Sequence, residues 1–318
     1  MLEVGGIISD YSDYPFDRIR LKPLEVGDML TLFNATQHRS VGTLVNLIQS
    51  HVDIDVTQLR VLDFKYILHW LKQKSYPENV MTVTWTCTNW PIQSIGIERV
   101  IKDVPYLEKL NSTSLEQLGY ERAACKRKNT TLVYNVRTRT TQIPVGFKLP
   151  KGYKFPLVRD LLEAEDLLEE PEYEHIVPYL MWLDCGTLKE ALELFDWYDD
   201  YEKTAGDIER FQALPYGTRI MYDLKCNRCD KQYTVDKDLD IFEILPAIDQ
   251  QKIMDLQYNI FGQFQGAVIS EDTPVMKLLY WHSCLVKDKQ KQEEERRKQA
   301  ASKSSSMSPT LAKHYGKR

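Results

Sequence analysis

The sequence predicts an α+β fold with small antiparallel sheets, a cysteine-knuckle turn, blocks of helices and a basic C-terminal tail that is disordered or helical. Two observations lead to this fold class. Apolar residues recur every three or four positions in several segments, which is typical of amphipathic helices, whereas other short segments are rich in β-branched and aromatic residues. The helical segments follow one another in blocks, while a parallel α/β sheet would require strands and helices to alternate.

Strands and helices are both predicted in the N-terminal region. Residues 16–24 alternate apolar and polar side chains up to a proline, which indicates a strand. Apolar spacing predicts helices at 26–35, 41–48 and 61–71. Further strands are predicted at 80–87, 131–136 and 142–149, whereas residues 92–130 show no clear period.

The C-terminal region contains a strongly acidic segment. Residues 160–210 hold seventeen acids and three bases, yet Leu188, Leu192, Phe195 and Tyr198 recur at helical spacing. We therefore expect helices with acidic surfaces rather than a disordered acidic run. Two strands, 218–226 and 232–235, and then two helices, 248–264 and 274–286, are predicted to follow, the helices as a hairpin.

A domain boundary is predicted near residue 150, where Pro150-Lys151-Gly152 precedes the acidic helices. This division gives an N-terminal α+β region (1–150), an acidic helical region with the cysteine turn and the last helix pair (151–286), and a basic polar tail (287–318). The alternative is one interleaved domain, because the turns that carry Cys87 and Cys226 would have to meet if they shared a metal ion. The tail is expected to extend the last helix and then fray.

Charge and composition restrict the class of protein. The net charge is −5, but residues 287–318 carry ten bases and four acids, so the first 286 residues are at −11. A body this acidic argues against binding along a phosphate backbone. Six cysteines in 318 residues are too few for a disulfide scaffold and suggest a reducing compartment. No long apolar segment and no signal-like start are present, so neither membrane insertion nor export is expected.

The sharpest local motif is Cys226-Asn227-Arg228-Cys229 between two predicted strands. Two thiolates on a tight turn form half of a structural zinc site, which needs four ligands. Cys87 also ends a predicted strand, but three residues later the chain has Trp90. The fourth ligand is left open among Cys125, Cys185, Cys284, His175 and His282. From the residues alone, a turn with free thiols is favoured over bound zinc, and a redox pair is disfavoured because the flanking segments are strands.

Catalytic signatures are missing from the sequence, which contains no phosphate-binding loop, dinucleotide fingerprint, zinc-protease motif or nucleophile elbow. Acid pairs such as Glu163 with Asp166, or Asp199 with Asp200, are expected by chance in so acidic a segment. A hydrolase is therefore disfavoured, and the chain is predicted not to be an enzyme. Aromatic residues in polar settings suit protein interfaces, and they include Tyr11, Tyr14, Trp197, Tyr198, Tyr201, Tyr280 and Trp281.

The order of these features resembles the baseplate hub and hub-assembly proteins of T-even-like contractile-tailed bacteriophages, over roughly residues 16–290. The resemblance rests on the patches Lys22-Pro23-Leu24-Glu25-Val26-Gly27-Asp28, Thr84-Trp85-Thr86-Cys87, Phe147-Lys148-Leu149-Pro150, Phe155-Pro156-Leu157, Lys225-Cys226-Asn227-Arg228-Cys229-Asp230-Lys231-Gln232-Tyr233 and Asp240-Ile241-Phe242.

The resemblance implies a structural or assembly component of the tail baseplate, made in the host cytoplasm and found in the virion. Such a protein contacts other baseplate and tail proteins within a symmetric multi-subunit assembly and does not turn over a substrate. The resemblance also implies metal ligands at Cys87, Cys226 and Cys229, with structural zinc as the one cofactor to consider. The chain departs from the family pattern at Trp90, where a second cysteine is expected.

An alternative of a different class is a zinc-knuckle nucleic-acid-binding accessory protein. Its basic segment 122–128 and its tail would contact phosphates, and Trp90 or Tyr233 would stack on bases. The acidic body makes nucleic acid the less favoured partner.

Overall fold

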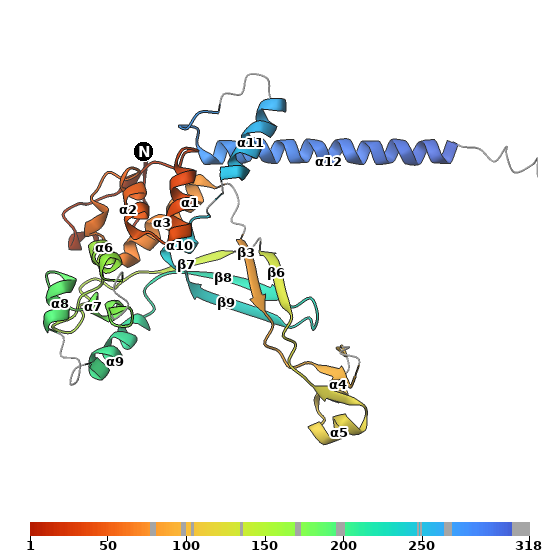
Figure 1. The fold of residues 1–318 in the computed structure, drawn as a ribbon, viewed down its shortest axis with the longest axis horizontal. Helices are drawn as coiled ribbons and strands as arrows, with labels where there is room; N and C mark the ends of the chain where they lie inside the picture. The colour runs from red at the N-terminus through yellow and green to blue at the C-terminus, as the bar shows by residue number, and fades with distance from the viewer. Residues whose placement is uncertain are drawn as a thin grey trace, which may run out of the picture.

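The computed structural model describes residues 1–76, 81–96, 100–102, 105–133, 136–168, 173–194, 201–246, 248, 250–263 and 269–306. It confirms the α+β fold class, with blocks of helices beside small antiparallel sheets (Figure 1). Three helices form the N-terminal block: α1 (Asp28–His38), α2 (Val41–Gln49) and α3 (Val61–Ser75). All three were predicted from apolar spacing, and the Ser40 hydroxyl caps α2 by accepting the Thr43 N–H at 3.2 Å.

The largest sheet has three antiparallel strands in the order β7 (Arg137–Thr141), β8 (Gly217–Lys225) and β9 (Gln232–Asp238). A separate antiparallel ribbon pairs β3 (Met81–Thr86) with β6 (Lys128–Val133), and Thr86 lies opposite Lys128. The ribbon runs beside the sheet in Figure 1. At the N-terminus, β1 (Leu2–Glu3) pairs with β2 (Arg20–Leu21).

Two predicted strands are wrong in extent or position. Only β2 forms within 16–24, because neighbouring backbone groups there bond elsewhere: Lys22 N–H donates to the His51 carbonyl and Leu24 N–H to the Ser75 hydroxyl. The segment 142–149 is a loop, since Phe147 N–H donates back to the Pro144 carbonyl and Gly146 has a φ of 78°. The strand lies just before this turn, at β7.

Beyond the first ribbon the chain forms a small projecting lobe, here called the tip lobe, made of the described residues from 92 to 122. It contains β4 (Ile92–Ser94), α4 (Pro105–Glu108), α5 (Ser112–Gln117) and β5 (Tyr120–Arg122), and β4 pairs with β5. Ile92, Leu107 and Leu115 form its own small core. The tip lobe stands at the lower right of Figure 1, away from the helical blocks.

The acidic segment is helical, as predicted. It contains α6 (Val158–Leu167), α7 (Val177–Leu180), α8 (Leu188–Leu194) and α9 (Tyr201–Gln212). Two carboxylates of α6 accept backbone N–H groups at the starts of other helices. Glu165 binds Val41 and Gly42 of α2 at 2.8 and 2.7 Å, and Glu163 binds Leu188 of α8 at 2.7 Å. Residues 195–200, which include Phe195, Tyr198, Asp199 and Asp200, lie outside the described residues.

The last helices are α10 (Ile241–Ile244), α11 (Gln250–Gln263) and α12 (Val275–Ser306). The predicted hairpin is present, since Ile253 and Ile260 of α11 and Leu278 of α12 are buried in the same core. As predicted, α12 continues past Val286, and residues 286–299 after the buried Leu285 are all exposed. The rest of α12 extends away from the body as a single rod (Figure 1).

The main core takes residues from both sides of the predicted boundary near residue 150. Phe64, Val158, Ile220 and Leu278 all belong to it, and each is at most 1% exposed. This sharing agrees with the alternative of one interleaved domain for residues 1–286, while the boundary itself stays a prediction. Among the described residues, no helix is both long enough and apolar enough to cross a bilayer.

A buried carboxylate attaches the N-terminal segment to α3. Asp63 is fully buried and accepts the N–H groups of Ile8 and Ser9 at 2.7 and 2.9 Å. The hydroxyls of Ser9 and Tyr14 donate to its second oxygen, each at 2.5 Å. Burial and the adjacent Asp63 raise the pKa of Tyr14. Four donors compensate the desolvation of one carboxylate, so this polar group specifies where residues 8–14 lie.

His69 on α3 makes stability depend on pH. Its side chain is buried, Nε2 has no partner among the described residues, and burial lowers the pKa of the imidazole from 6.5 to about 4. Between these pH values the unfolded chain binds a proton that the folded chain does not. The folded state therefore loses stability as pH falls through this window and regains it as pH rises.

His69→Leu should remove this pH dependence, which amounts to about 3 kcal/mol of the free energy of unfolding between pH 6.5 and pH 4. Urea unfolding at several pH values measures it, with the exposed His38→Leu variant as the matched control. If the free energy of unfolding of His69→Leu depended on pH as steeply as that of the unaltered protein, His69 would not be the group responsible.

Candidate metal centre

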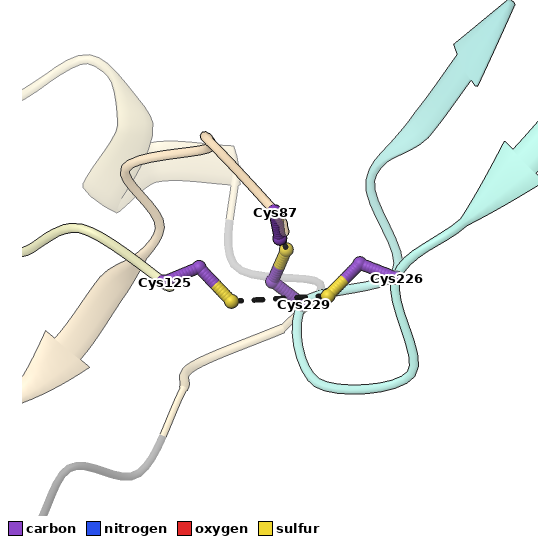
Figure 2. A group of neighbouring side chains, drawn as sticks. All are labelled: Cys87, Cys125, Cys226 and Cys229. Carbon is purple, nitrogen blue, oxygen red and sulfur yellow. Dashed lines mark hydrogen bonds between the residues drawn. The ribbon is translucent and has the colours of Figure 1, made fainter. Parts of the chain in front are cut away.

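Four cysteines from three segments of the chain point toward one another at the junction between the β3–β6 ribbon and the β8–β9 hairpin (Figure 2). Cys87 directly follows β3, and Cys125 lies shortly before β6. Cys226 and Cys229 lie in the turn between β8 and β9. All four are free thiols, and three are buried while Cys229 is half-buried.

The sulfur atoms have the separations of a tetrahedral ligand set. Cys87 Sγ lies 3.6 Å from Cys229 Sγ, and Cys125 Sγ lies 3.8 Å from Cys226 Sγ. All four sulfurs are within 4.8 Å of one another. Four sulfurs that each lie about 2.3 Å from a central ion would be about 3.8 Å apart. The four cysteines can therefore hold a metal ion with little rearrangement.

Backbone hydrogen bonds fix the two cysteines at the end of the ribbon. Cys87 N–H donates to the Arg127 carbonyl at 2.9 Å, which continues the β3–β6 ladder by one residue. Cys125 N–H donates to the Asn89 carbonyl at 2.8 Å, and Lys126 has a φ of 47°. This left-handed residue turns the chain between Cys125 and β6.

The other two cysteines are fixed by a tight turn. Asp230 N–H donates to the Cys226 carbonyl at 2.9 Å, and Cys226 N–H donates to the Lys231 carbonyl at 3.0 Å. Asp230 has a φ of 57°, which an aspartate tolerates better than most residues. The turn places both thiols on the side that faces the ribbon.

Several donors point at the sulfur atoms. Arg228 N–H lies 3.4 Å from Cys226 Sγ, and the side-chain amide of Asn89 lies 3.5 Å from Cys229 Sγ. The Asn129 amide nitrogen is 3.8 Å from Cys226 Sγ, while its oxygen accepts the Asn227 N–H at 3.3 Å. N–H groups directed at sulfur stabilise thiolates, and donors of this kind orient and tune metal ligands.

The thiols differ in how readily they ionise. Burial raises the pKa of Cys125 to about 12 and also raises that of Cys229. Burial opposes ionisation of Cys226 too, but N–H groups of Cys229 and Arg228 outweigh it and lower the pKa to about 7. The lowered pKa of Cys226 therefore favours this thiol over Cys125 and Cys229 for binding a cation, and a bound cation would favour ionisation of the other ligands.

Aromatic rings enclose the centre on one side. Trp85 and Tyr233 meet edge to face with ring centroids 5.2 Å apart, and both pack on the cysteine cluster. The Tyr233 hydroxyl is 3.2 Å from Cys87 Sγ. Tyr233 thus serves as a wall of the centre.

The structure brings together the three cysteines predicted as ligands, Cys87, Cys226 and Cys229, and adds Cys125 as the fourth. Within the described part of the chain, Cys185, Cys284, His175 and His282 are not members of this group. Trp90, at the position where the family pattern has a cysteine, is 61% exposed. The tip lobe is inserted between Cys87 and Cys125, so no short spacing marks this pair in the sequence.

No protein-family model matches this chain, and comparisons with curated proteins and with solved structures give no significant match. The centre is therefore interpreted from its own geometry.

Cobalt(II) binding should show that all four thiols act together. The unaltered protein should give the sulfur-to-cobalt charge-transfer absorption of a tetrahedral four-thiolate site, and Cys125→Ser should weaken binding as much as Cys229→Ser, by at least about tenfold. Cys284→Ser, which removes a half-buried thiol outside the group, is the control. Equal cobalt binding by Cys125→Ser and the unaltered protein would exclude Cys125 as a ligand.

Proposed function

We propose that the four cysteines bind one structural zinc ion, and that the protein is a non-enzymatic structural or assembly component of a contractile-tail baseplate. The observation that supports the zinc site is the convergence of four sulfurs within 4.8 Å from separate segments of the chain. Four sulfur ligands in a tetrahedral arrangement are the set that structural zinc prefers.

The composition of the centre favours a structural role over a catalytic one. Catalytic zinc usually has three protein ligands and an open position for water or substrate. Here Cys87, Cys125, Cys226 and Cys229 would fill all four positions. Zinc would then stabilise the fold by joining chain segments, and its binding free energy would contribute to folding.

The zinc ion would join the ribbon that carries the tip lobe to the three-stranded sheet. Polar contacts also cross this junction. Arg228 Nη1 donates to the Cys125 carbonyl at 3.2 Å, Asn227 N–H donates to Asn129 Oδ1 at 3.3 Å, and Lys102 forms an ion pair with Asp230. We infer that zinc would reinforce these contacts and help to fix the direction of the tip lobe.

The baseplate assignment rests on the order of sequence features over residues 16–290 and is supported by exposed interaction surfaces. Met254, Tyr258 and Phe261 recur at i, i+4 and i+7 on α11 and are 53%, 81% and 55% exposed. Exposed aromatic stripes suit contacts with other proteins. The partners would be other baseplate and tail proteins in a symmetric assembly. The protein would meet them in the host cytoplasm and would be part of the virion.

Zinc content is the direct test of the first part of the proposal. The purified protein should contain one equivalent of zinc by elemental analysis. A strong chelator should lower its Tm and broaden its peak in size-exclusion chromatography. Cys226→Ser should lose the zinc, whereas Cys185→Ser should retain it. A metal-free protein with the same Tm and elution profile before and after chelation would refute the zinc site.

Tail assembly tests the second part. In the phage that encodes this chain, deletion of the gene should leave tails without complete baseplates in electron micrographs of lysates. An allele that ends after Lys289 should yield a protein with an unchanged Tm, because residues 290–299 are all exposed, and should assemble fewer tails. Normal tails in the full deletion would refute the baseplate role, and an unfolded truncated protein would show that residues 290–318 are not an appendage.

A further inference from the structure

A cleft of about 320 Å³ separates the tip lobe from the Cys226–Cys229 turn. One wall comes from the tip lobe and the segment that leads into it, and the other comes from the turn. Its polar lining residues include Asn89, Lys102, Glu108, Arg122, Asp230 and Lys231. Cys229 also lines the cleft, so the walls meet at the metal centre.

The end of the molecule that carries this cleft is basic, as is the C-terminal tail, whereas the chain as a whole is acidic. Residues 92–133 and 225–231 carry ten bases and six acids, a net +4, whereas the whole chain is at −5. The cleft lining itself has three bases and two acids. Lys126, Arg127 and Lys128 are all exposed next to Cys125. A concentrated positive region on an acidic protein attracts a negatively charged partner to this end.

An exposed aromatic residue lies on the same cleft. Trp90 lines it and is 61% exposed, and Tyr106 on α4 is 62% exposed. Trp, Tyr and Arg dominate the binding energy of protein interfaces. A tryptophan beside Arg122 and Lys231 is therefore the combination expected of a recognition site.

The lining favours a peptide over nucleic acid. Asp230 forms ion pairs with both Lys102 and Lys225, and Glu108 also lines the cleft. Every nucleotide would bring a phosphate toward these carboxylates, whereas a peptide can place its own carboxylates at Arg122 and Lys231 and an N–H group at Glu108. Pro91, Ile92 and Ile101 supply apolar wall, which suits an aromatic or aliphatic side chain more than a phosphate backbone.

We infer that this cleft binds an acidic peptide segment of a partner protein, with carboxylates near Arg122 and Lys231 and an aromatic side chain against Trp90. The inference deepens the proposed function, on which it rests, because zinc would hold the two walls of the cleft together. Binding should therefore be lost when zinc is removed, although none of the lining cations is a ligand.

Fluorescence anisotropy with the full-length zinc-loaded protein tests this site. The probe is a short fluorescein-labelled peptide of alternating Glu and Tyr, with a Gln-Tyr peptide and an oligothymidylate of similar length as comparisons. Lys231→Glu and Trp90→Ala should each weaken binding of the Glu-Tyr peptide by at least about tenfold. The matched controls are Lys203→Glu on α9 and Tyr258→Ala on α11, both exposed and both outside the cleft.

Zinc content and Tm are measured on the same samples, which separates failure of the cleft from failure of the metal site. Lys231→Glu and Trp90→Ala should keep their zinc and Tm while they lose the peptide. Equal peptide binding by the cleft variants and the controls, no binding of the Glu-Tyr peptide, or tighter binding of the oligothymidylate would each overturn the acidic-peptide site, even if zinc is present. Absence of zinc would instead refute the proposed function.

Discussion

The convergence of four thiols at one junction is the constraint on which the placement of the β3–β6 ribbon and the tip lobe depends. The ribbon that carries the tip lobe contacts the three-stranded sheet where Cys87 and Cys125 meet Cys226 and Cys229, and again where Val133 of β6 joins the main core. Elsewhere the tip lobe has its own small core, separate from the main one. A lobe with so small a core depends for its position on the ribbon and on the contacts at this junction.

In the helical blocks, carboxylates fix the positions of chain segments by accepting their N–H groups. Asp63 fixes the N-terminal segment on α3, and Glu165 and Glu163 bind the starts of α2 and α8. Asp160 is buried and accepts the Leu157 N–H at 2.8 Å and the Lys154 ammonium at 3.1 Å. The acidic character of this region is thus partly internal, because several acids satisfy backbone donors that would otherwise be unpaired.

Local patterns predicted most of the elements and drew attention to the Cys226–Cys229 turn and to Cys87, while the ligand roles of these three cysteines came from the resemblance. Apolar spacing was sufficient for α1, α2, α3, α11 and α12, and β-branched residues marked β3 and β8, since these signals are contained within one segment. The tip lobe was not predicted because its helices span only one or two turns and show no period. Cys125 could not be placed for a different reason: its position beside Cys87 depends on the register of β3 with β6, a long-range pairing that no short motif encodes.

Because the cysteines are far apart in the sequence, the two pairs are synthesised at different times. Cys125 and Cys226 are 101 residues apart, and Cys87 and Cys229 are 142 residues apart. On the ribosome, the ribbon and its lobe emerge well before the β8–β9 hairpin that supplies the second pair of thiols. A nascent chain therefore presents Cys87 and Cys125 without their partners for several seconds at ordinary rates of synthesis, about 5–20 residues per second. During that interval the two thiols of the ribbon lack the pair that encloses them in the finished molecule.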